Sequence, residues 1–219
     1  MENREDTFDR FVNMEHPEDF LERLQPFTEL MMHYQCAMLE VQTKLEVLDK
    51  ELSLRSSRNP FESIKCRLKT PMSIVEKLQR KGLPLSVASI EENLNDIAGV
   101  RVVCSFPDDI YALAESLTAQ DDVKVLIRKD YIQNPKANGY RSLHLVLQVP
   151  IFLSAQKKEV KVEVQFRTIA MDFWASLEHK VRYKKDVPHS DQIGEELRQC
   201  AEAISQLDQR MQEIRKSIS

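Results

Sequence analysis

Apolar and polar residues alternate strictly along residues 160–167, which read Val-Lys-Val-Glu-Val-Gln-Phe-Arg. Successive side chains of a β-strand point to opposite faces of its sheet, so this pattern predicts a strand with one apolar face. The other face carries Lys161, Glu163, Gln165 and Arg167. Such a face is either a solvated sheet surface or the floor of a polar cleft, and this segment alone is compatible with both.

Strand-like and helical patterns alternate through the middle of the chain. The strand-like runs are 63–69, 97–104, 141–149 and 159–167, with a weaker fifth at 123–128. The helical patterns lie at 71–81, 89–95, 108–118 and 168–184. This alternation predicts an α/β or α+β domain, in which a β-sheet of about five strands is flanked by helices, and we expect the mixed α+β class.

Two long heptad patterns flank this middle region. The N-terminal one consists of Phe20, Leu24, Phe27, Met31, Tyr34, Met38, Val41, Leu45, Leu48 and Leu52. The C-terminal one consists of Ile193, Leu197, Cys200, Ile204, Leu207, Met211, Ile214 and Ile218. Proline suits the first turn of a helix, so Pro26 predicts a helix start near residues 25–28 with a shorter helix before it. Each long helix either packs on its own sheet or associates into a symmetric oligomer.

These patterns divide the chain into an N-terminal helical region (1–58), a central domain (59–185) and a C-terminal helix (186–219). The composition, 42% hydrophobic and 30% charged with a net charge of −4, is typical of a globular protein and does not indicate RNA binding. The acidic start is unlike a signal peptide and no apolar run approaches membrane-spanning length, so we expect a cytoplasmic protein. The four cysteines are widely spaced, which favours reduced core thiols over disulfides or a zinc site.

Residues 62–82 form a basic segment within this acidic chain. Thr70 and Pro71 predict a helix start that directly follows a strand. The basic side chains of the strand and the helix are Lys65, Arg67, Lys69, Lys77, Arg80 and Lys81, and Ser73 shares their helix face. Cations beside a helix N-terminus suit a polyphosphate, although a solvated basic face would look the same. No glycine-rich phosphate loop is present, so side chains would hold the phosphates.

Two acids are candidates for a shared site. Asp96 precedes the strand that contains Gly99 and Arg101, and Glu163 lies on the strand described first. We expect these strands to be neighbours, so that the two acids form a carboxylate pair. Such a pair facing a phosphate site suits Mg²⁺. Asp96 could instead be a cap or turn residue.

A polar loop at residues 130–139 ends in the turn signal Asn138-Gly139. Tyr140 and His144 then share one face of the next strand. Tyr140 could stack on a base, with Lys129 and Lys136 supplying positive charge, or both side chains could simply be packed.

Taken in order, these motifs resemble the synthetase domain of the RelA/SpoT alarmone enzymes. The matching motifs are Arg67-x-Lys69, Asp96-x-x-Gly99-x-Arg101, Asn138-Gly139-Tyr140-Arg141-Ser142-x-His144, Glu163-x-Gln165-x-Arg167-Thr168 and the segment from Met171 to His179. The resemblance covers roughly residues 60–185, and the flanking helices are similar to those of the stand-alone small alarmone synthetases. It implies a nucleotidyltransferase-like fold and a catalytic role for the central domain.

The resemblance also implies an activity, namely Mg²⁺-dependent transfer of the pyrophosphate of ATP to the 3′-hydroxyl of GDP or GTP. It assigns ATP binding to Arg67, Lys69, Ser73, Lys77, Arg80 and Arg101. It assigns the acceptor side to Tyr140, which stacks on guanine, and to Lys129, Lys136, His144 and Gln165. Asp96 and Glu163 are implied as catalytic residues and metal ligands, with Glu163 acting on the metal or on the 3′-hydroxyl. Asp172 and Ala175 are candidates for reading the edge of guanine.

Long members of this family add a hydrolase domain with an adjacent His-Asp pair, and this sequence has no His-Asp dipeptide. We therefore expect synthesis without hydrolysis, and the resemblance implies a homotetramer. The alternatives are a catalytically silent nucleotide- or RNA-binding regulator on the same fold, and a coiled-coil interaction protein. A pure binder would have little use for two facing acids, and a coiled-coil protein would not account for the polar strand faces.

Overall fold

The computed structural model of the chain describes residues 17–55, 58–182 and 190–218. Several expectations from the sequence lie outside the described residues. These are the acidic start, the side chain of Phe20, the last two residues of the helix expected at 168–184, and the domain limits at 185 and 186.

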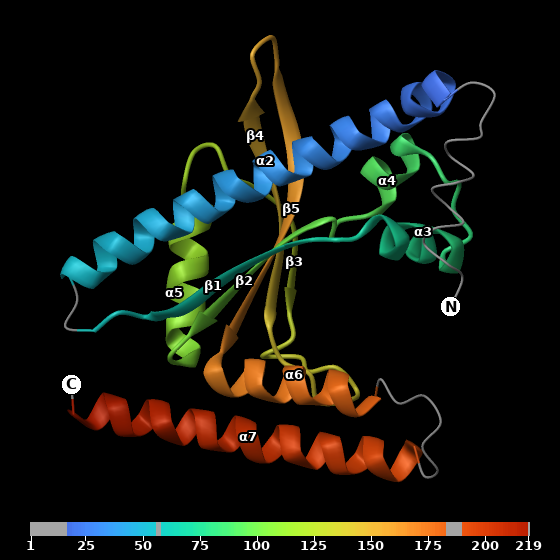
Figure 1. The fold of residues 1–219 in the computed structure, drawn as a ribbon. Coiled ribbons are helices and arrows are strands. Elements are labelled where there is room, and N and C mark those ends of the chain that lie inside the picture. The colour runs from blue at the N-terminus through green and yellow to red at the C-terminus, as the bar shows by residue number, and fades with distance from the viewer. Residues whose placement is uncertain (1–16, 56–57, 183–189, 219) are drawn as a thin grey trace.

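A five-stranded mixed sheet forms the centre of the molecule, with the strand order β1-β2-β5-β4-β3 (Figure 1). The strands are β1 (Phe61–Leu68), β2 (Ala98–Cys104), β3 (Lys124–Asp130), β4 (Leu143–Phe152) and β5 (Lys157–Thr168). β2 and β5 are parallel, and the other neighbouring pairs are antiparallel. The predicted fold class, the weak fifth strand and the adjacency of the Asp96 and Glu163 strands are confirmed.

Six helices are described around this sheet. They are α2 (Pro17–Arg55), α3 (Pro71–Arg80), α4 (Val87–Asn93), α5 (Pro107–Thr118), α6 (Ile169–Arg182) and α7 (Ser190–Ile218). The predicted start of α3 is confirmed, because the Thr70 side chain accepts a hydrogen bond from the Ser73 backbone N–H and Pro71 follows it. Gly82, just beyond its end, has a φ of 66°, as expected for a glycine after a helix. Among the described residues, no helix has the length and apolar content needed to cross a bilayer.

The N-terminal helix differs from the prediction at Pro26. α2 is one continuous helix from Pro17 to Arg55, and Pro26 lies inside it. Proline removes one backbone hydrogen bond, but its fixed φ of about −65° is close to the helical value. A single proline can therefore be accommodated in a helix whose following turns are held by packing on the sheet.

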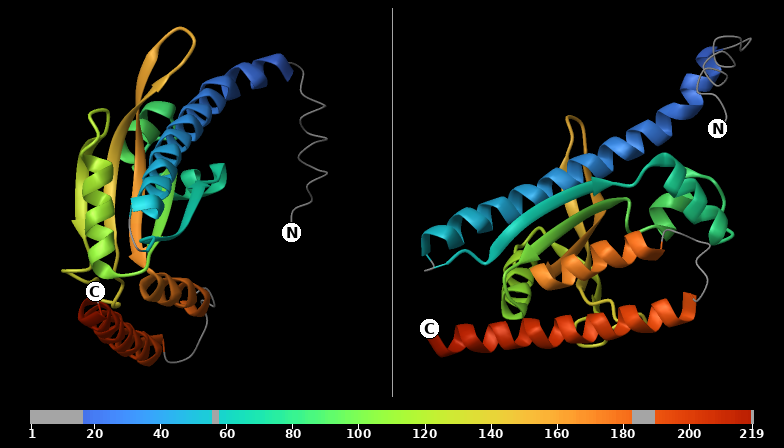
Figure 2. Two further views of the ribbon diagram at one scale, coloured as in Figure 1. Left: turned by 90° about the vertical axis from the view of Figure 1, so that its left-hand side faces the viewer. Right: turned by 60° about the horizontal axis from the view of Figure 1, so that its bottom comes forward.

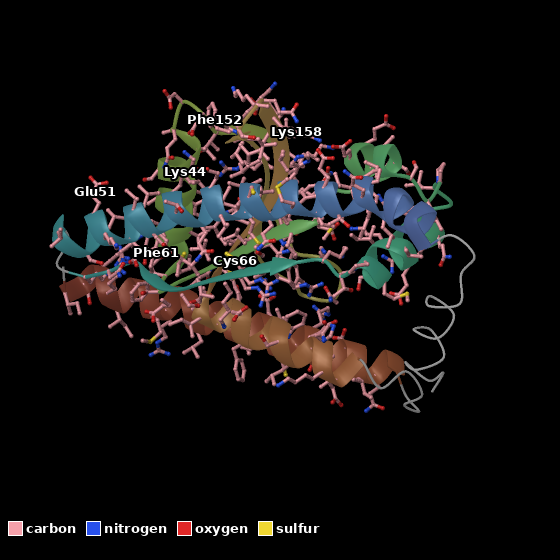
Figure 3. The ribbon with its side chains drawn as sticks, turned by 45° about the horizontal axis from the view of Figure 1, so that its top comes forward. Lys44, Glu51, Phe61, Cys66, Phe152 and Lys158 are labelled. Atoms are coloured by element: carbon pink, nitrogen blue, oxygen red, sulfur yellow. The ribbon has the colours of Figure 1, made fainter. Side chains whose placement is uncertain are left out.

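α2 and α5 cover the apolar face of the sheet, and α2 crosses the strands diagonally (Figures 1 and 2). The side chains of α2 that are buried in this core are Leu30, Tyr34, Ala37, Val41 and Leu45. They form one cluster with the inward side chains of β5, which include Val162, Val164 and Phe166. Lys44, which is labelled in Figure 3, also joins α2 to the loop before β3 through an ion pair of 2.6 Å with Asp122. The first heptad pattern thus serves the core of its own domain.

The second heptad pattern has a different environment. α7 lies beside α6 at one end of the sheet (Figure 2), yet four of its heptad residues are exposed, namely Leu207, Met211, Ile214 and Ile218. Cys200 is exposed as well, so the prediction that all four cysteines are core thiols is wrong at this position. The face of α7 that meets the domain instead carries Ala201 and Asp208. The reason is that α7 packs on α6 and on the turn at Gly139, not on the apolar face of the sheet.

Candidate active site

The face of the sheet opposite α2 and α5 carries most of the predicted site residues. Strand register places Gly99 beside Glu163 and Arg101 beside Gln165 on the parallel pair β2–β5. On the outer neighbours, Arg67 pairs with Gly99 and His144 pairs with Gln165. The alternating pattern of 160–167 therefore marks the floor of a polar cleft, and the solvated-surface alternative is excluded for Glu163 and Gln165.

The first of two adjoining cavities has a volume of about 380 Å³ and lies over β1, β2 and β5. Its charged and polar lining consists of Lys65, Arg67, Lys69, Asp96, Arg101, Glu163 and Gln165. Three of the residues predicted to bind ATP, Arg67, Lys69 and Arg101, are thus brought together. Gly99 lines the floor, so the backbone of β2 is open to a ligand there.

The second cavity, of about 290 Å³, lies between α3 and the β3–β4 side of the sheet. It is lined by four lysines, Lys77, Lys81, Lys129 and Lys136, together with Asn93, Asn95, Ile127, Tyr131, His144 and Val146. Asp96 and Glu163 line it too, and they line the first cavity as well. The two acids therefore stand at the junction of two positively charged cavities.

Asp96 is held by the basic segment. Its Oδ2 lies 2.6 Å from Lys77 Nζ and 3.1 Å from Lys69 Nζ. Burial acts to raise the pKa of Asp96, but hydrogen bonds and charge from the two lysines outweigh burial and hold this pKa below its usual value. Its other oxygen, Oδ1, is buried and has no hydrogen-bond partner among the described residues. The structure thus keeps Asp96 ionised and leaves one of its oxygens without a hydrogen-bond partner among the described residues.

Glu163 is bound by two neighbouring side chains. Its Oε1 lies 3.3 Å from His144 Nδ1, and its Oε2 accepts a hydrogen bond of 2.8 Å from the Gln165 amide. Burial acts to raise the pKa of Glu163, while His144 and Gln165 lower it, and the net pKa lies below the usual value. A charged carboxylate is therefore fixed in orientation at the cleft floor.

The donor atoms of this junction fit a magnesium ion. Mg²⁺ prefers oxygen ligands and commonly binds one or two carboxylates together with substrate phosphates. The unpartnered Oδ1 of Asp96 and the carboxylate of Glu163 match this preference. Among the described residues no group of three or more acids, histidines or cysteines could hold a metal ion alone. A metal bound here would need additional ligands such as phosphate oxygens.

Tyr140 belongs to a polar aromatic cluster at the entrance of β4. Its hydroxyl is 2.8 Å from His144 Nε2 and accepts a hydrogen bond of 2.7 Å from Arg167 Nη2. Lys136 Nζ lies 4.8 Å from the Tyr140 ring centre and 4.7 Å from that of Tyr131. The predicted acceptor residues Tyr140, Lys136 and His144 are thus in one place, and Gln165 joins them through Glu163.

Two predicted ATP ligands lie outside these cavities. Ser73 takes part in the cap of α3, where it also accepts a hydrogen bond of 2.9 Å from the Thr70 hydroxyl. Arg80 is exposed near the end of the same helix. Neither residue lines either cavity, so their roles remain predictions.

Other residues of the site were not assigned a role from the sequence. Asn93, Asn95 and Tyr131 line the second cavity, and Arg167 contacts Tyr140. The position of Tyr131 in a polar loop was a usable signal, because an aromatic residue there is unusual. Asn93 and Asn95 carried no such signal, since asparagines are common where a helix gives way to a loop. Asp172, a candidate for reading guanine, is bound by Arg101 at 3.2 Å and by Arg167 at 3.1 Å.

Comparison with known proteins agrees with this geometry. A family model described as the region found in RelA and SpoT proteins matches residues 66–187. The GTP pyrophosphokinase YwaC of Bacillus subtilis is 42% identical over 94% of this chain and 99% of its own length. The GTP pyrophosphokinase YjbM of the same organism is 38% identical over 86% of this chain and 88% of its own length.

Solved structures show the same similarity. Small alarmone synthetase 1 of Bacillus subtilis, bound to its product pppGpp, superimposes with a TM-score of 0.81 at 37% identity, covering 89% of this chain and 98% of that one. Small alarmone synthetase 2 of the same organism has a TM-score of 0.78 at 44% identity, covering 87% and 98%. A family match across more than half of the chain, with the matched motifs meeting in one cleft, shows that this chain belongs to the RelA/SpoT family.

Proposed function

We propose that the chain is a GTP pyrophosphokinase that transfers the pyrophosphate of ATP to the ribose 3′-hydroxyl of GDP or GTP. The products are AMP and the alarmone ppGpp or pppGpp. The observation that carries this proposal is the pair of acids, Asp96 and Glu163, at the junction of two basic cavities. Transfer of a pyrophosphate from one nucleotide to another needs two phosphate-binding cavities that meet at the reacting atoms. The names of the relatives and the pppGpp-bound structure of small alarmone synthetase 1 support this reading.

The first cavity suits the donor. Arg67 and Arg101 line it and can flank the adenine ring through their planar guanidinium groups. Lys69 lines this cavity and Lys77 lines the second one, and both contact Asp96 between them. They would neutralise the charge of the ATP phosphates, and such neutralisation is a main contribution of the protein to phosphoryl transfer. Ser73 and Arg80 remain proposed ligands of the same phosphates, and only the resemblance to the family supports this role.

The second cavity suits the acceptor. Tyr140 lies beside this cavity, in contact with its lining residues Lys136 and His144, and would stack on guanine. Lys129, Lys136 and Lys81 would bind the 5′-phosphates. Glu163, kept ionised, accepts the proton of the 3′-hydroxyl as that oxygen bonds to the β-phosphorus of ATP. The bond from the β-phosphorus to the oxygen that bridges it to the α-phosphorus breaks, and AMP leaves with that oxygen. His144 and Gln165 hold Glu163 in place for this step.

We propose Mg²⁺ as the cofactor, held by Asp96 and Glu163 together with substrate phosphates. Bound there, it would neutralise charge that develops on the phosphate oxygens. The unpartnered oxygen of Asp96 supports this assignment.

We also propose a homotetramer that works in the cytoplasm, where ATP and GTP are available, and that makes the alarmone without hydrolysing it. The exposed apolar residues of α7 support self-association, and α6 adds Ile169, Phe173, Leu177 and Val181. Large exposed apolar patches commonly mark protein interfaces. Light scattering coupled to gel filtration tests this point, and Phe173→Glu with Leu177→Glu should shift the mass towards smaller species.

The activity is tested by incubating the purified protein with ATP labelled at the β-phosphate, GDP or GTP, and Mg²⁺, and then resolving the nucleotides. We expect the label on the guanosine nucleotide and equimolar AMP. Label that stays on ATP while both nucleotides bind would contradict the enzyme and favour a silent nucleotide-binding regulator. Labelled pppGpp added alone should stay intact if the protein has no hydrolase activity.

A further inference from the structure

Arg167 is a buried charged side chain beside Tyr140 that lines neither cavity and has no role in the proposed reaction. It lies at the end of β5 and is only 5% exposed. Its Nη2 donates to the Tyr140 hydroxyl at 2.7 Å and to Gln165 Oε1 at 2.9 Å, and its Nη1 donates to Asp172 Oδ1 at 3.1 Å. Its guanidinium carbon also lies 5.2 Å from the centre of the Tyr140 ring. Arg167 is therefore in direct contact with the proposed guanine-stacking residue.

The same carboxylate oxygen that binds Arg167 also binds Arg101. Asp172 Oδ1 lies 3.2 Å from Arg101 Nη1 and 3.1 Å from Arg167 Nη1. Arg101 lines the donor cavity. Because both arginines bind the same oxygen of this partly buried carboxylate, a shift of Asp172 towards one of them lengthens its contact with the other. A continuous chain of contacts thus joins the donor cavity to the acceptor tyrosine through Arg101, Asp172, Arg167 and Tyr140.

Each substrate would bind one end of this chain. A base placed against Arg101 fixes the plane of that guanidinium, and through Asp172 it restricts the position of Arg167. Arg167 in turn fixes the hydroxyl of Tyr140, and with it the orientation of the ring on which guanine stacks. A side chain that is already ordered costs less conformational entropy when the second ligand binds.

On this geometry, and resting on the proposed function, we propose that Arg167 is a positioning residue that couples the binding of ATP to the binding of the guanosine acceptor. The coupling is positive and reciprocal, so each nucleotide raises the affinity for the other by the same factor. Arg167 itself need not touch either substrate. Its guanidinium suits this task because its planar array of donors can bind a carboxylate, an amide and a hydroxyl together.

Calorimetry with two unreactive nucleotides tests the proposal. The affinity for α,β-methylene-ATP is measured in Mg²⁺ with and without saturating GDP, and the affinity for GDP is measured with and without the analogue. In the wild-type protein we expect each to bind about 5- to 10-fold more tightly when the other is present, within the usual range of coupling between sites. Equal affinities in the presence and absence of the partner nucleotide would overturn the inference without any variant.

Two variants locate the coupling. Arg167→Lys keeps a positive charge but cannot reach all three partners, and Asp172→Asn removes the shared charge. Each should bring the coupling factor close to one, and the double variant should lower the coupling no further. Arg167→Lys should also leave the affinity for each nucleotide alone within about 3-fold, whereas Asp172→Asn, which changes a candidate guanine-reading residue, is judged by its coupling factor only. A loss of overall stability alone would lower the fraction of active protein but would not abolish the coupling. Full coupling in either variant contradicts the role of Arg167.

Arg128→Lys is the matched control, because Arg128 is exposed on β3 and lines neither cavity. Its coupling factor should equal that of the wild type. The label-transfer assay separates this inference from the proposed function. Wild-type protein that makes pppGpp but binds the two nucleotides independently refutes only the inference, whereas wild-type protein that makes no product refutes the proposed function.

Discussion

Gly139 lies against Ala201 so closely that a Cβ added to the glycine would be 2.5 Å from the Cβ of Ala201. The two residues join the turn before Tyr140 to α7. Next to this contact, the Thr168 hydroxyl donates a hydrogen bond of 2.6 Å to Asp208 on α7, and Arg141 pairs with Glu202 at 3.2 Å. The C-terminal helix therefore supports the acceptor side of the cleft, although it contributes no residue to either cavity.

Gly139→Ala should destabilise the protein and weaken acceptor binding. The new methyl group would clash with Ala201, and the backbone φ of 87° is one that side chains disfavour. Overpacking of this kind costs about 1–3 kcal/mol. We expect a lower melting temperature and a KM for GDP that rises more than the KM for ATP, measured by thermal unfolding and steady-state kinetics.

Gly82→Ala is the matched control for that variant. Gly82 also has a positive φ, of 66°, but nothing lies within 4 Å of the position of its added Cβ. Gly82→Ala should lose only the stability that a positive φ costs an alanine, which is a smaller loss than in Gly139→Ala. Equal losses in both variants would mean that the contact with Ala201 is not what requires a glycine at position 139.

Glu163→Gln should abolish pyrophosphate transfer, because an amide cannot accept the proton of the 3′-hydroxyl. General-base catalysis contributes roughly 10²–10⁴-fold to a rate, so kcat should fall by at least about 100-fold. Binding of α,β-methylene-ATP should remain measurable by calorimetry. Full turnover by this variant would show that Glu163 neither accepts the proton of the 3′-hydroxyl nor holds the metal ion needed for the reaction.

Tyr140→Ala should chiefly raise the KM of the acceptor. Stacking of a base on an aromatic side chain is worth about 1–3 kcal/mol, and 1.4 kcal/mol corresponds to tenfold in affinity. We therefore expect the KM for GDP to rise roughly tenfold or more, with a much smaller change in the KM for ATP. Tyr140→Phe keeps the ring and should have the smaller effect. A rise confined to the KM for ATP would place the tyrosine on the donor side.

Removal of divalent cations should stop the reaction. We expect a chelator to abolish label transfer and added Mg²⁺ to restore it, since the two acids offer oxygen ligands for a hard cation. Asp96→Asn should require more Mg²⁺ for half-maximal activity, because it weakens one of the proposed ligands. Unchanged activity in excess chelator would rule out the proposed cofactor.

Asp208→Asn should stabilise the protein at neutral pH. Burial raises the pKa of Asp208, and the hydrogen bond from Thr168 lowers it only in part, so the folded protein favours the neutral acid. An acid with a raised folded-state pKa costs stability as the pH rises from its unfolded pKa, about 3.9, through its folded pKa. The free energy of unfolding of Asp208→Asn should therefore exceed that of the wild type by an amount that grows with pH and then levels off.

Thermal unfolding of the wild type and Asp208→Asn between pH 4 and pH 8 measures this difference. Asparagine can still accept the hydrogen bond from Thr168, which caps α6 by accepting from the Met171 backbone N–H. Glu213→Gln, on an exposed position of α7, serves as the control and should show no such trend. A difference between wild type and Asp208→Asn that is the same at every pH would contradict the raised pKa.

The local patterns of the sequence predicted most of the helices and strands and many of the residues that line the two cavities. Strand and helix periodicities located the elements between residues 61 and 182 to within a few residues, and Thr70 with Pro71 marked the start of α3. These features depend on neighbouring residues only, which is why they can be read from the chain. The helix start predicted at Pro26 was wrong for the same reason, because the packing of the whole of α2 on the sheet is not a local property.

By itself, then, the sequence determined the alternating polar face of β5, the basic segment before α3 and the ordered motifs of the family. Only the tertiary structure decided that Asp96 is held by Lys69 and Lys77, that Asp172 is shared by Arg101 and Arg167, and that α7 supports the turn at Gly139. Periodicity assigns a side chain to a face of its own element. Its partner is chosen by strand register and helix docking, which bring together residues far apart in the chain.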